Sequence, residues 1–575
     1  MAQEVPAGWP AVSLERAHEL LTAPGAPFEM AETSIRGHSS RVWKNAPPTL
    51  RDVFLAGRAF GDRVFLVHED ERVTFEGFSR AAITMAHWLR KQGVKKGDRV
   101  AILMRNLPEW PVSYFAALLV GAIATPLNGW WSGEELVYGL QDSGARILIA
   151  DAERYARIAE HRAQCPGIER VVVTRAERGQ PDGTFAFSSI VGAPGTWSDL
   201  PDMPLPEVAL EPEDDASILY TSGTTGSSKG AIQTHRNSTC AILAAQFAAA
   251  RNFIRRGEPL PAPDPNILRA TLIAVPFFHT TGAHAILCPS LVAGAKIVMM
   301  RRFDPVRAMQ LIERERVTSA GGVPTIAWQI IEHPDRPKYD LSSLEAISYG
   351  GAPASSELVR RIVEIFPKSA PGIGWGMTET TSTFTSNSAE DYRNRPESAG
   401  PCIPVCDMKV VDDAGRTLEP GVAGELWVRG PNVVRGYWKK PEATAKAFEG
   451  DWLKTGDIAK IDAEGFVYIV DRKKDIVIRG GENIYCIEVE EVLYRHPAIM
   501  DAALIGLPHR TLGEEPAAVV TLKPGMSVSE DELRAVVGEH LAAFKTPVRI
   551  AFSGEPLPRN APGKIMKPQL RALFD

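Results

Sequence analysis

One pattern recurs along this chain: an apolar strand follows a helix and ends in glycine or polar residues. Residues 79–93 (SRAAITMAHWLRKQG) have the periodicity of an amphipathic helix, and DRVAILM and ARILIAD then read as strands. The strand pattern returns in RATLIAVPFF, AKIVMM, TSAGGVPT and EAISYGGAP. Such alternation indicates an α/β domain with a parallel sheet, in which ligands bind outside the carboxyl ends of the strands. The glycine-rich strand ends are therefore candidates for one shared site.

The pattern changes after Gly400. Short alternating strands with turns, MKVVDDAGRTL, GELWVRG and GFVYIVD, predict a β-rich subdomain. The C-terminal part then reads as a small α+β unit with its own apolar core, as in IEVEEVLYRH, MDAALIGLP and AAVVTLK. Because 575 residues exceed a single core, we predict a large domain over 1–473 and a small domain over 474–575. The boundary is placed at Lys474, in the charged stretch DRKKDIVIRGGENI.

Composition and charge limit the partners. The net charge is −6 and the Lys and Arg residues are scattered, which argues against nucleic acid. The six cysteines lie far apart except for Cys402 and Cys406, with no second pair to complete a zinc site. The N-terminus has no signal core, RALFD is not a peroxisomal address, and the apolar run Tyr114–Leu127 is too short to span a bilayer. We expect a cytoplasmic protein with reduced thiols and no transmembrane segment.

The stretch Ser217–Gly230, SILYTSGTTGSSKG, has the composition of a phosphate-binding loop. Lys229 does not follow a glycine directly, and the next residues read as a strand, so the spacing does not fit the usual P-loop. Glycines let backbone N–H groups turn toward an anion, and a lysine can close such a nest. Composition alone leaves a solvated Ser/Thr/Gly linker as an equal alternative.

Eight motifs stand in one order between Tyr220 and Lys567: YTSGTTGSSKG, PFFHTTG, YGGAP, GWGMTET, GELWVRG, WLKTGD, VDRKKDIVIRGGENI and PRNAPGKIMK. Together they resemble the AMP-forming acyl-CoA synthetases of the adenylate-forming superfamily, which includes beetle luciferases and peptide-synthetase adenylation domains. The resemblance covers nearly the whole chain. It implies that an acid reacts with ATP to give acyl-AMP and pyrophosphate, and that the acyl group then passes to CoA. ATP, Mg²⁺ and CoA are the implied cosubstrates and cofactor.

The resemblance implies roles for individual residues in the nucleotide site. The loop would hold the β- and γ-phosphates, Trp375 (usually tyrosine in the family) would stack on the purine, and Glu379 would be a ligand of Mg²⁺. Asp457 and Arg472 would bind the ribose hydroxyls. Without the motifs, Trp375 would be interpreted as a core aromatic residue, and the charged residues as solvent-exposed side chains. The implied ATP-binding residues are Thr221, Ser222, Gly223, Thr224, Thr225, Lys229, Gly351, Ala352, Pro353, Gly374, Trp375, Gly376, Met377, Thr378, Asp457, Ile469, Arg472 and Lys564.

Lys564, in PRNAPGKIMK, is the residue most directly implied in catalysis, with His279, Thr378 and Glu379 beside it. Attack of a carboxylate on the α-phosphorus brings two anions together, and a cation that bridges them stabilises the transition state by about 4 kcal/mol per close contact. No general base is needed, because the carboxylate is already ionised. In the family the small domain then turns about a hinge, which maps here to Lys474. The segment implied to meet CoA is Arg479, Gly480, Gly481 and Glu482.

The acid itself is less constrained. The resemblance implies an acyl pocket lined by Phe278, His279, Gly322, Val323, Gly350, Gly376 and Met377. Nothing acidic lies in PFFHTTG, which disfavours an amino acid, and Gly376 replaces the second tryptophan of acetate-type relatives, which predicts an open floor. We expect a medium- or long-chain fatty acid, or a bulky aryl-alkanoic or sterol-type acid.

Two other functions stay open on the sequence. The acyl group could pass to an amine or to a separate carrier protein instead of CoA. A non-catalytic nucleotide-binding protein on the same fold is the alternative from another class, although Lys564, Glu379, Asp457 and Arg472 are all present. A homodimer and peripheral contact with a membrane are compatible with the sequence and are not predicted by any motif.

Overall fold

The first α/β unit is built around a mostly parallel sheet. The computed structural model describes residues 9–574 except 178, 222–227, 263, 265–266, 352–353 and 561–562. The sheet has the order β11-β10-β6-β5-β7-β8-β9. Its strands are β5 (Arg99–Leu103), β6 (Ile123–Pro126), β7 (Ile147–Asp151), β8 (Arg170–Thr174), β9 (Phe185–Ala186), β10 (Asp215–Tyr220) and β11 (Gly230–Thr234). Its helices are α3 (Phe75–Lys91), α4 (Glu109–Leu119), α5 (Gly133–Ser143), α6 (Ala152–Ala159) and α7 (Phe187–Val191).

Strand β5 shows why this sheet forms. All of Val100–Leu103 is buried, and alternate residues enter two different cores: Val100 and Ile102 on one face, Ala101 and Leu103 on the other. A strand covered on both faces must be apolar throughout, which is typical of parallel sheets. The predicted helix–strand alternation is confirmed here, and α3 begins at a Thr74 cap whose hydroxyl accepts from Gly77 N.

The second sheet carries the glycine-ending strands and has the order β17-β16-β15-β14-β12-β13-β3-β4. Its strands are β3 (Val64–His68), β4 (Glu71–Thr74), β12 (Ala270–Ile273), β13 (Lys296–Met299), β14 (Ser319–Gly322), β15 (Ala346–Gly350), β16 (Ala370–Met377) and β17 (Ser382–Ser388). The associated helices are α2 (Leu50–Arg58), α8 (His235–Arg255), α9 (Cys288–Ala293), α10 (Pro305–Glu315), α11 (Pro324–Ile331), α12 (Ser356–Ile365) and α13 (Ala389–Asn394). The four predicted strands β12–β15 are parallel neighbours, so their carboxyl ends meet at one edge.

The β-rich part follows as a sheet of order β18-β23-β22-β20-β19, with β21 beside β22. Its elements are β18 (Gly400–Pro401), β19 (Asp407–Val411), β20 (Gly424–Arg429), β21 (Phe448–Glu449), β22 (Trp452–Ile461), β23 (Phe466–Arg472) and α14 (Pro441–Ala447). At the start of the described chain, α1 (Leu14–Thr22) and the hairpin β1 (Met30–Ile35) and β2 (His38–Trp43) pack near it. Phe28 and Trp43 share a core with Phe247 of α8.

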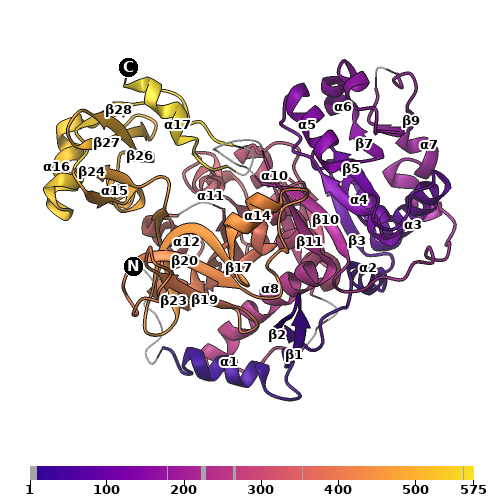
Figure 1. The fold of residues 1–575 in the computed structure, drawn as a ribbon, viewed down its shortest axis with the longest axis horizontal. Coiled ribbons are helices and arrows are strands. Elements are labelled where there is room, and N and C mark those ends of the chain that lie inside the picture. Colours follow the sequence, from indigo (N-terminus) through magenta and orange to yellow (C-terminus); the bar gives the residue numbers. More distant parts are fainter. Residues whose placement is uncertain are drawn as a thin grey trace.

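The C-terminal unit has a separate sheet of order β25-β24-β27-β26, with β28 beside β27. Its elements are β24 (Val477–Arg479), β25 (Glu482–Ile484), β26 (Ile499–His509), β27 (Gly513–Leu522), β28 (Arg549–Phe552), α15 (Cys486–Tyr494), α16 (Glu530–His540) and α17 (Lys567–Leu570). Figure 1 shows this unit in yellow at the upper left, projecting from the rest of the molecule. Lys474 lies in the connection between β23 and β24. Within the described residues, no helix combines the length and apolar character needed to cross a bilayer.

Candidate active site

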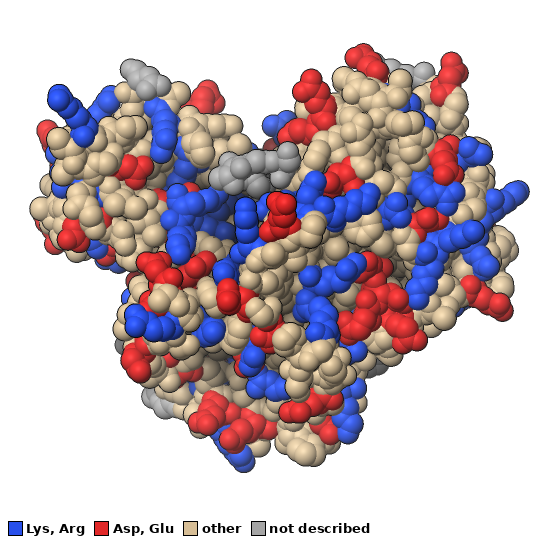
Figure 2. Space-filling view, in the orientation of Figure 1, with Lys and Arg blue, Asp and Glu red and all other residues tan. Residues whose placement is uncertain are grey.

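A cavity of about 1270 Å³ lies between the C-terminal unit and the larger part of the chain. The larger part contributes Trp375, Asp457 and Arg472 to its lining, and the C-terminal unit contributes Lys564. Figure 2 shows a notch between the two parts with Lys and Arg side chains around it. Other predicted nucleotide residues in the lining are Gly351, Gly374, Gly376 and Ile469. Residues more than 180 positions apart in the sequence thus face one space.

Asp457, on β22, is at the centre of the polar side chains of this cavity. Its carboxylate is 1% exposed, and Trp375 Nε1 donates a hydrogen bond to Oδ2 over 2.9 Å. Arg472, directly opposite on β23, places Nε 2.6 Å from Oδ1. Burial raises the pKa of this carboxyl, while Arg472 and Trp375 oppose the rise. The sequence predicted a ribose site with Asp457 and Arg472, but not that Trp375 would be tied to the same carboxylate.

Lys564 is held by contacts with residues on its N-terminal side. Asn560 accepts from Lys564 N through Oδ1 over 2.8 Å, and its own N donates to Lys564 O over 2.9 Å. Arg559 donates to Gly563 O over 2.6 Å and pairs with Asp501 of β26. These contacts couple Lys564 to the C-terminal sheet, so the lysine is positioned by that unit. Arg559 and Asp501 were not predicted, since no local pattern links residues 58 positions apart.

The charge of Lys564 is sensitive to pH. Burial lowers the pKa of its ammonium group to about 8, with repulsion from Arg472 as a further cause. The lysine is therefore protonated at pH 7 and loses its charge as the pH rises through 8. We expect kcat/KM for ATP in acid-dependent pyrophosphate release to be level from pH 6 to 7 and to fall by about half near pH 8, because this ratio reports groups of the free enzyme.

The matched control for this pH profile is Lys564→Arg, because a guanidinium stays charged throughout the range. Its residual activity should show no fall near pH 8. An identical fall in wild type and in the arginine variant would show that another group titrates.

Glu379 lies beside Tyr437, at the predicted phosphate end of the site. Tyr437 donates its hydroxyl hydrogen to Glu379 Oε1 over 2.6 Å, and Lys229 Nζ lies 4.9 Å from the centre of the Tyr437 ring. Tyr437 is held beside β11 by a bridge to Ala231. The predicted loop lysine and predicted metal ligand are therefore joined through one tyrosine. Tyr437 was missed because it lies 58 residues from Glu379 and stands in no recognised motif.

The residues present fit a magnesium ion that is shared with phosphate. Glu379 is 7% exposed, and Tyr437 engages one of its two carboxylate oxygens. Mg²⁺ is usually bound through one or two carboxylates together with substrate phosphates. Among the described residues no group of three or more His, Cys, Asp or Glu side chains could hold a metal ion by itself. Thr378, next to Glu379, is also buried, and its carbonyl accepts from Gln233.

The two ends of the glycine-rich loop are described and its middle is not. Thr221 N donates to Lys229 O over 2.9 Å, and Lys229 N donates to Thr221 Oγ1 over 3.2 Å, which closes a hairpin between β10 and β11. This confirms the predicted position of the loop between two strands. The predicted residues outside the described part of the chain are Ser222, Gly223, Thr224, Thr225, Ala352 and Pro353.

The residues of the predicted acyl wall stand at or after the carboxyl ends of strands such as β12, β14 and β16. Phe278 is buried and His279 is half-buried, and burial lowers the pKa of His279 to about 4, so its imidazole is neutral at pH 7. Its Nδ1 lies 3.1 Å from Thr281 Oγ1. Val323 is buried in the core against α11. Neither His279 nor its apolar neighbours offers a charge to a substrate.

Glycines in this wall serve backbone packing more than pocket volume. A Cβ at Gly376 would lie 1.7 Å from Ser382 O, and one at Gly350 would lie 2.7 Å from Gly374 O. Both positions therefore exclude any side chain because a neighbouring strand approaches closely. The sequence suggested an open pocket floor because glycine replaces tryptophan at position 376. The structure gives another reason for this glycine, the close approach of Ser382 O. At Gly322 the Cβ would meet the side chains of Val275 and Ile326 instead.

The segment predicted to meet CoA lies apart from Lys564. Arg479–Glu482 form the turn between β24 and β25, with Gly480 at φ +61° and Gly481 at φ +91°. Residues without a Cβ adopt these values at low cost. None of the four residues lines the interdomain cavity, whereas Lys564 does. The structure thus brings the predicted catalytic lysine to the nucleotide residues and leaves the predicted CoA segment outside.

Comparison with known proteins agrees with this arrangement. Residues 54–438 match the AMP-binding enzyme family, and residues 488–564 match the AMP-binding enzyme C-terminal domain. The chain belongs to the AMP-binding enzyme family of adenylate-forming acyl-CoA synthetases. It is 33% identical to a feruloyl-CoA synthase from Amycolatopsis over 512 residues, covering 88% of this chain and 95% of the relative.

Two other members of the family are similar over nearly their whole length. A 3-[(3aS,4S,7aS)-7a-methyl-1,5-dioxo-octahydro-1H-inden-4-yl]propanoyl:CoA ligase from Mycobacterium tuberculosis is 36% identical over 523 residues, covering 90% of this chain and 97% of that one. The structure of o-succinylbenzoate CoA synthetase from Bacillus subtilis with ATP and magnesium superposes with a TM-score of 0.73 at 31% identity, covering 92% and 100%. The fold and enzyme class predicted from the motifs are confirmed.

Proposed function

We propose that this acyl-CoA synthetase activates a bulky, ring-bearing apolar carboxylic acid as its acyl-adenylate and transfers the acyl group to CoA. The observation that carries the proposal is the meeting of Lys564 with Asp457, Arg472 and Trp375 in one cavity. A cation from the C-terminal unit thereby stands beside the predicted ribose and purine contacts.

In the first step, a carboxylate oxygen of the acid forms a bond to the α-phosphorus of ATP, and the bond to the bridging oxygen of pyrophosphate breaks. Lys564 donates to the oxygens on which negative charge gathers, and Asp457 with Arg472 fixes the ribose. Lys229 and the loop bind the departing phosphates. Glu379 would hold Mg²⁺, which neutralises phosphate charge when bound. Neutral His279 adds no charge beside the attacking carboxylate, and none of these residues needs to act as a general base.

In the second step, the thiol of CoA loses its proton to solvent and its sulfur forms a bond to the acyl carbon. The bond between that carbon and the phosphate oxygen breaks, and AMP leaves. Lys564 occupies the cavity while Gly480 and Gly481 lie outside it, which supports two arrangements of the C-terminal unit, one for each step. Lys474 stands in the connection that would have to turn. The position of the cavity between the two parts of the chain would limit the access of water to the reactive anhydride until the thiol arrives.

The acid class rests on the wall and on the relatives. Phe278 and Val323 are apolar and buried, and His279 is uncharged, so an ammonium or a second carboxylate would be poorly solvated there. The relatives described above act, by their names, on feruloyl and on ring-bearing propanoyl groups. Both acids carry a ring at the end of a short carboxylic chain. We therefore propose this type ahead of a linear fatty acid.

The test is mass spectrometry of the reaction of the full chain with ATP, Mg²⁺ and CoA and a pooled set of aryl-propenoic, ring-bearing propanoic and linear fatty acids. We expect thioesters of ring-bearing acids, with kcat/KM at least about tenfold above that of any linear fatty acid, since fit in an apolar pocket discriminates by such factors. A preference for linear acids would overturn the acid class. Acyl-AMP that CoA leaves untouched, but that an added amine consumes, would overturn the acceptor.

A further inference from the structure

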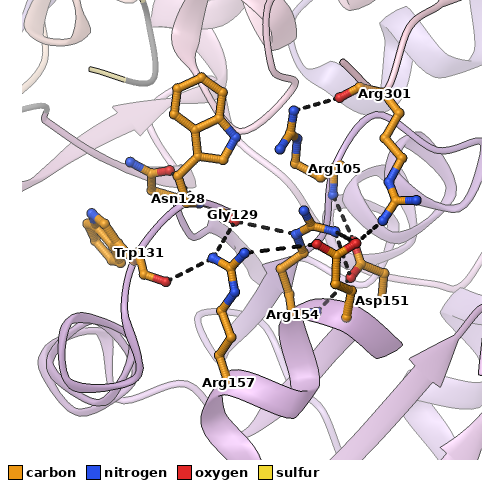
Figure 3. Close-up of polar contacts among 10 residues, drawn as sticks. Arg105, Asn128, Gly129, Trp131, Asp151, Arg154, Arg157 and Arg301 are labelled. Atoms are coloured by element: carbon orange, nitrogen blue, oxygen red, sulfur yellow. Dashed lines mark hydrogen bonds and ion pairs between the residues drawn. The ribbon is translucent and has the colours of Figure 1, made fainter. Parts of the chain in front are cut away.

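Many polar contacts between distant segments of this chain stay within the larger domain. Figure 3 shows one set, in which Arg157 donates to the carbonyls of Gly129 and Trp131 over 3.2 Å each. In the same set Arg105 donates to Arg301 O over 2.6 Å. Such contacts do not depend on the position of the C-terminal unit. A contact between the two units, in contrast, stabilises one arrangement of them over others.

One contact of the second kind joins α12 of the larger domain to α15 of the C-terminal unit (Figure 1). Ser356 N donates to Glu491 Oε1 over 3.0 Å, and the Ser356 hydroxyl donates to the same oxygen. Ser356 is the first residue of α12. A carboxylate at this position is favoured by the unpaired N–H groups of the first turn and by the helix dipole. The start of α12 is therefore completed by a side chain of the other unit.

Helix α12 does not use the cap that its own sequence provides. Ser355 stands at the N-cap with φ −71° and ψ 148°, but its side chain accepts no capping hydrogen bond. Its hydroxyl oxygen is buried and has no partner among the described residues. A serine in this position normally accepts from an N–H of the first turn. Ser355 can therefore supply a local acceptor when Glu491 is absent.

The contact belongs to the wall of the interdomain cavity. Ser355 and Glu491 both line it, together with Lys564. Gly351, a predicted nucleotide residue, also lines it and precedes Ser356 by five positions. Glu491 thus contacts the larger domain close to the residues that are predicted to bind ATP.

Helix α15 also connects this contact to the catalytic lysine. Glu490, the neighbour of Glu491, places Oε1 2.8 Å from Lys567 Nζ. Lys567 follows Lys564 by three positions. One face of the connection is therefore Ser356 of the larger domain, and the other is the segment that contains Lys564.

We propose that Glu491 is a positioning residue for adenylation, whose contact with the start of α12 stabilises the arrangement in which Lys564 faces the nucleotide residues. Glu491 acts through Lys564 and takes no part in making or breaking bonds. The inference rests on the proposed two-step reaction, in which the C-terminal unit turns between the steps. The contact breaks at that turn, and the Ser355 hydroxyl then supplies an acceptor at the start of α12.

The experiment measures the two half-reactions separately in Glu491→Ala and in Ser356→Pro. Proline is tolerated at the first position of a helix, and the extended backbone of Ser355 suits a residue that precedes proline. Ser356→Pro therefore removes both donors to Glu491 and keeps α12. We expect each variant to lower the rate of acyl-adenylate formation about five- to tenfold, because fewer molecules are in the adenylation arrangement. Transfer from supplied acyl-AMP to CoA should be at least as fast as in wild type.

A double variant and a matched control complete the comparison. Glu491→Ala/Ser356→Pro should be no slower in adenylation than either single variant, since both substitutions remove the same contact. Glu488→Ala removes another carboxylate of α15, whose partner Lys545 belongs to the same unit. This control should keep both half-reactions within about twofold of wild type.

Hydrogen exchange of the Ser356 amide, resolved by fragmentation in a mass spectrometer, gives a readout that needs no catalysis. We expect exchange about fivefold or more faster in Glu491→Ala than in wild type, because the amide loses its acceptor. Equal exchange would show that the contact does not form in solution and would overturn the proposal.

Two combined outcomes separate the role of the contact from the proposed function. If exchange differs but both half-reactions fall equally in Glu491→Ala, the contact is structural only and the positioning role is wrong. If exchange differs and wild type forms no acyl-AMP, the proposed function fails, and with it the role in adenylation, while the contact between the two units stands.

Discussion

Replacing Lys564 with alanine should reduce the rate of acyl-adenylate formation by about 10²–10³-fold, because the substitution removes the cation that we propose stabilises charge at the α-phosphate. Transfer from supplied acyl-AMP to CoA should change by no more than about threefold, since we propose that the lysine leaves the site in that step. The two half-reactions are measured separately, by acid-dependent pyrophosphate release and by thioester formation from synthetic acyl-AMP.

Two further variants make this result interpretable. Lys564→Arg keeps the charge and should recover part of the adenylation rate. Lys368→Ala removes an exposed lysine of the larger domain and should behave as wild type. Equal loss of both half-reactions in Lys564→Ala would contradict the division of roles and point to a structural effect of the loop.

Asp457→Ala should raise KM for ATP by about a hundredfold, because the buried carboxylate aligns Arg472 and Trp375, and each lost charge-assisted hydrogen bond costs about 1.5–3 kcal/mol. In the proposed site the aspartate also offers its remaining lone pairs to the ribose diol. The free energy of unfolding should fall by less than the free energy of ATP binding. Arg472 is 34% exposed and can be hydrated when its partner is removed. KM is measured by AMP formation at saturating acid and CoA.

Asp457→Asn retains an acceptor oxygen and should lie between wild type and the alanine variant. The control is Asp451→Ala, which removes a carboxylate from the same sheet that pairs with Arg429. A KM for ATP within twofold of wild type in Asp457→Ala would show that the ribose is bound elsewhere.

The fold could be predicted to a large extent from the chain because its local signals agree. Strands β5, β7, β12 and β13 are short and mostly apolar, and α3 has both an amphipathic face and a Thr74 cap. Burial on both faces of a sheet requires apolar residues at consecutive positions of a strand, and this pattern can be recognised in the sequence. The order of strands in the two sheets could not be predicted from such local patterns, because it depends on which helices cover which face of each sheet.

The site could be predicted only where a motif contains its residues. Lys229, Trp375, Glu379, Asp457, Arg472 and Lys564 stand in motifs, and the structure places them around the interdomain cavity or beside Tyr437. Tyr437 and the pair Arg559 and Asp501 act across 58 residues each, and pairing over such distances is set by tertiary packing.

The measurement that tests the central claim most directly is exchange of labelled pyrophosphate into ATP by the full chain, with Mg²⁺ and a ring-bearing acid and without CoA. The account predicts exchange that depends on the acid, because acyl-AMP and pyrophosphate form reversibly before any thiol is present. Addition of CoA should then yield AMP and thioester in equal amounts. Exchange that is absent without CoA, or release of ADP and phosphate in place of AMP and pyrophosphate, would contradict it.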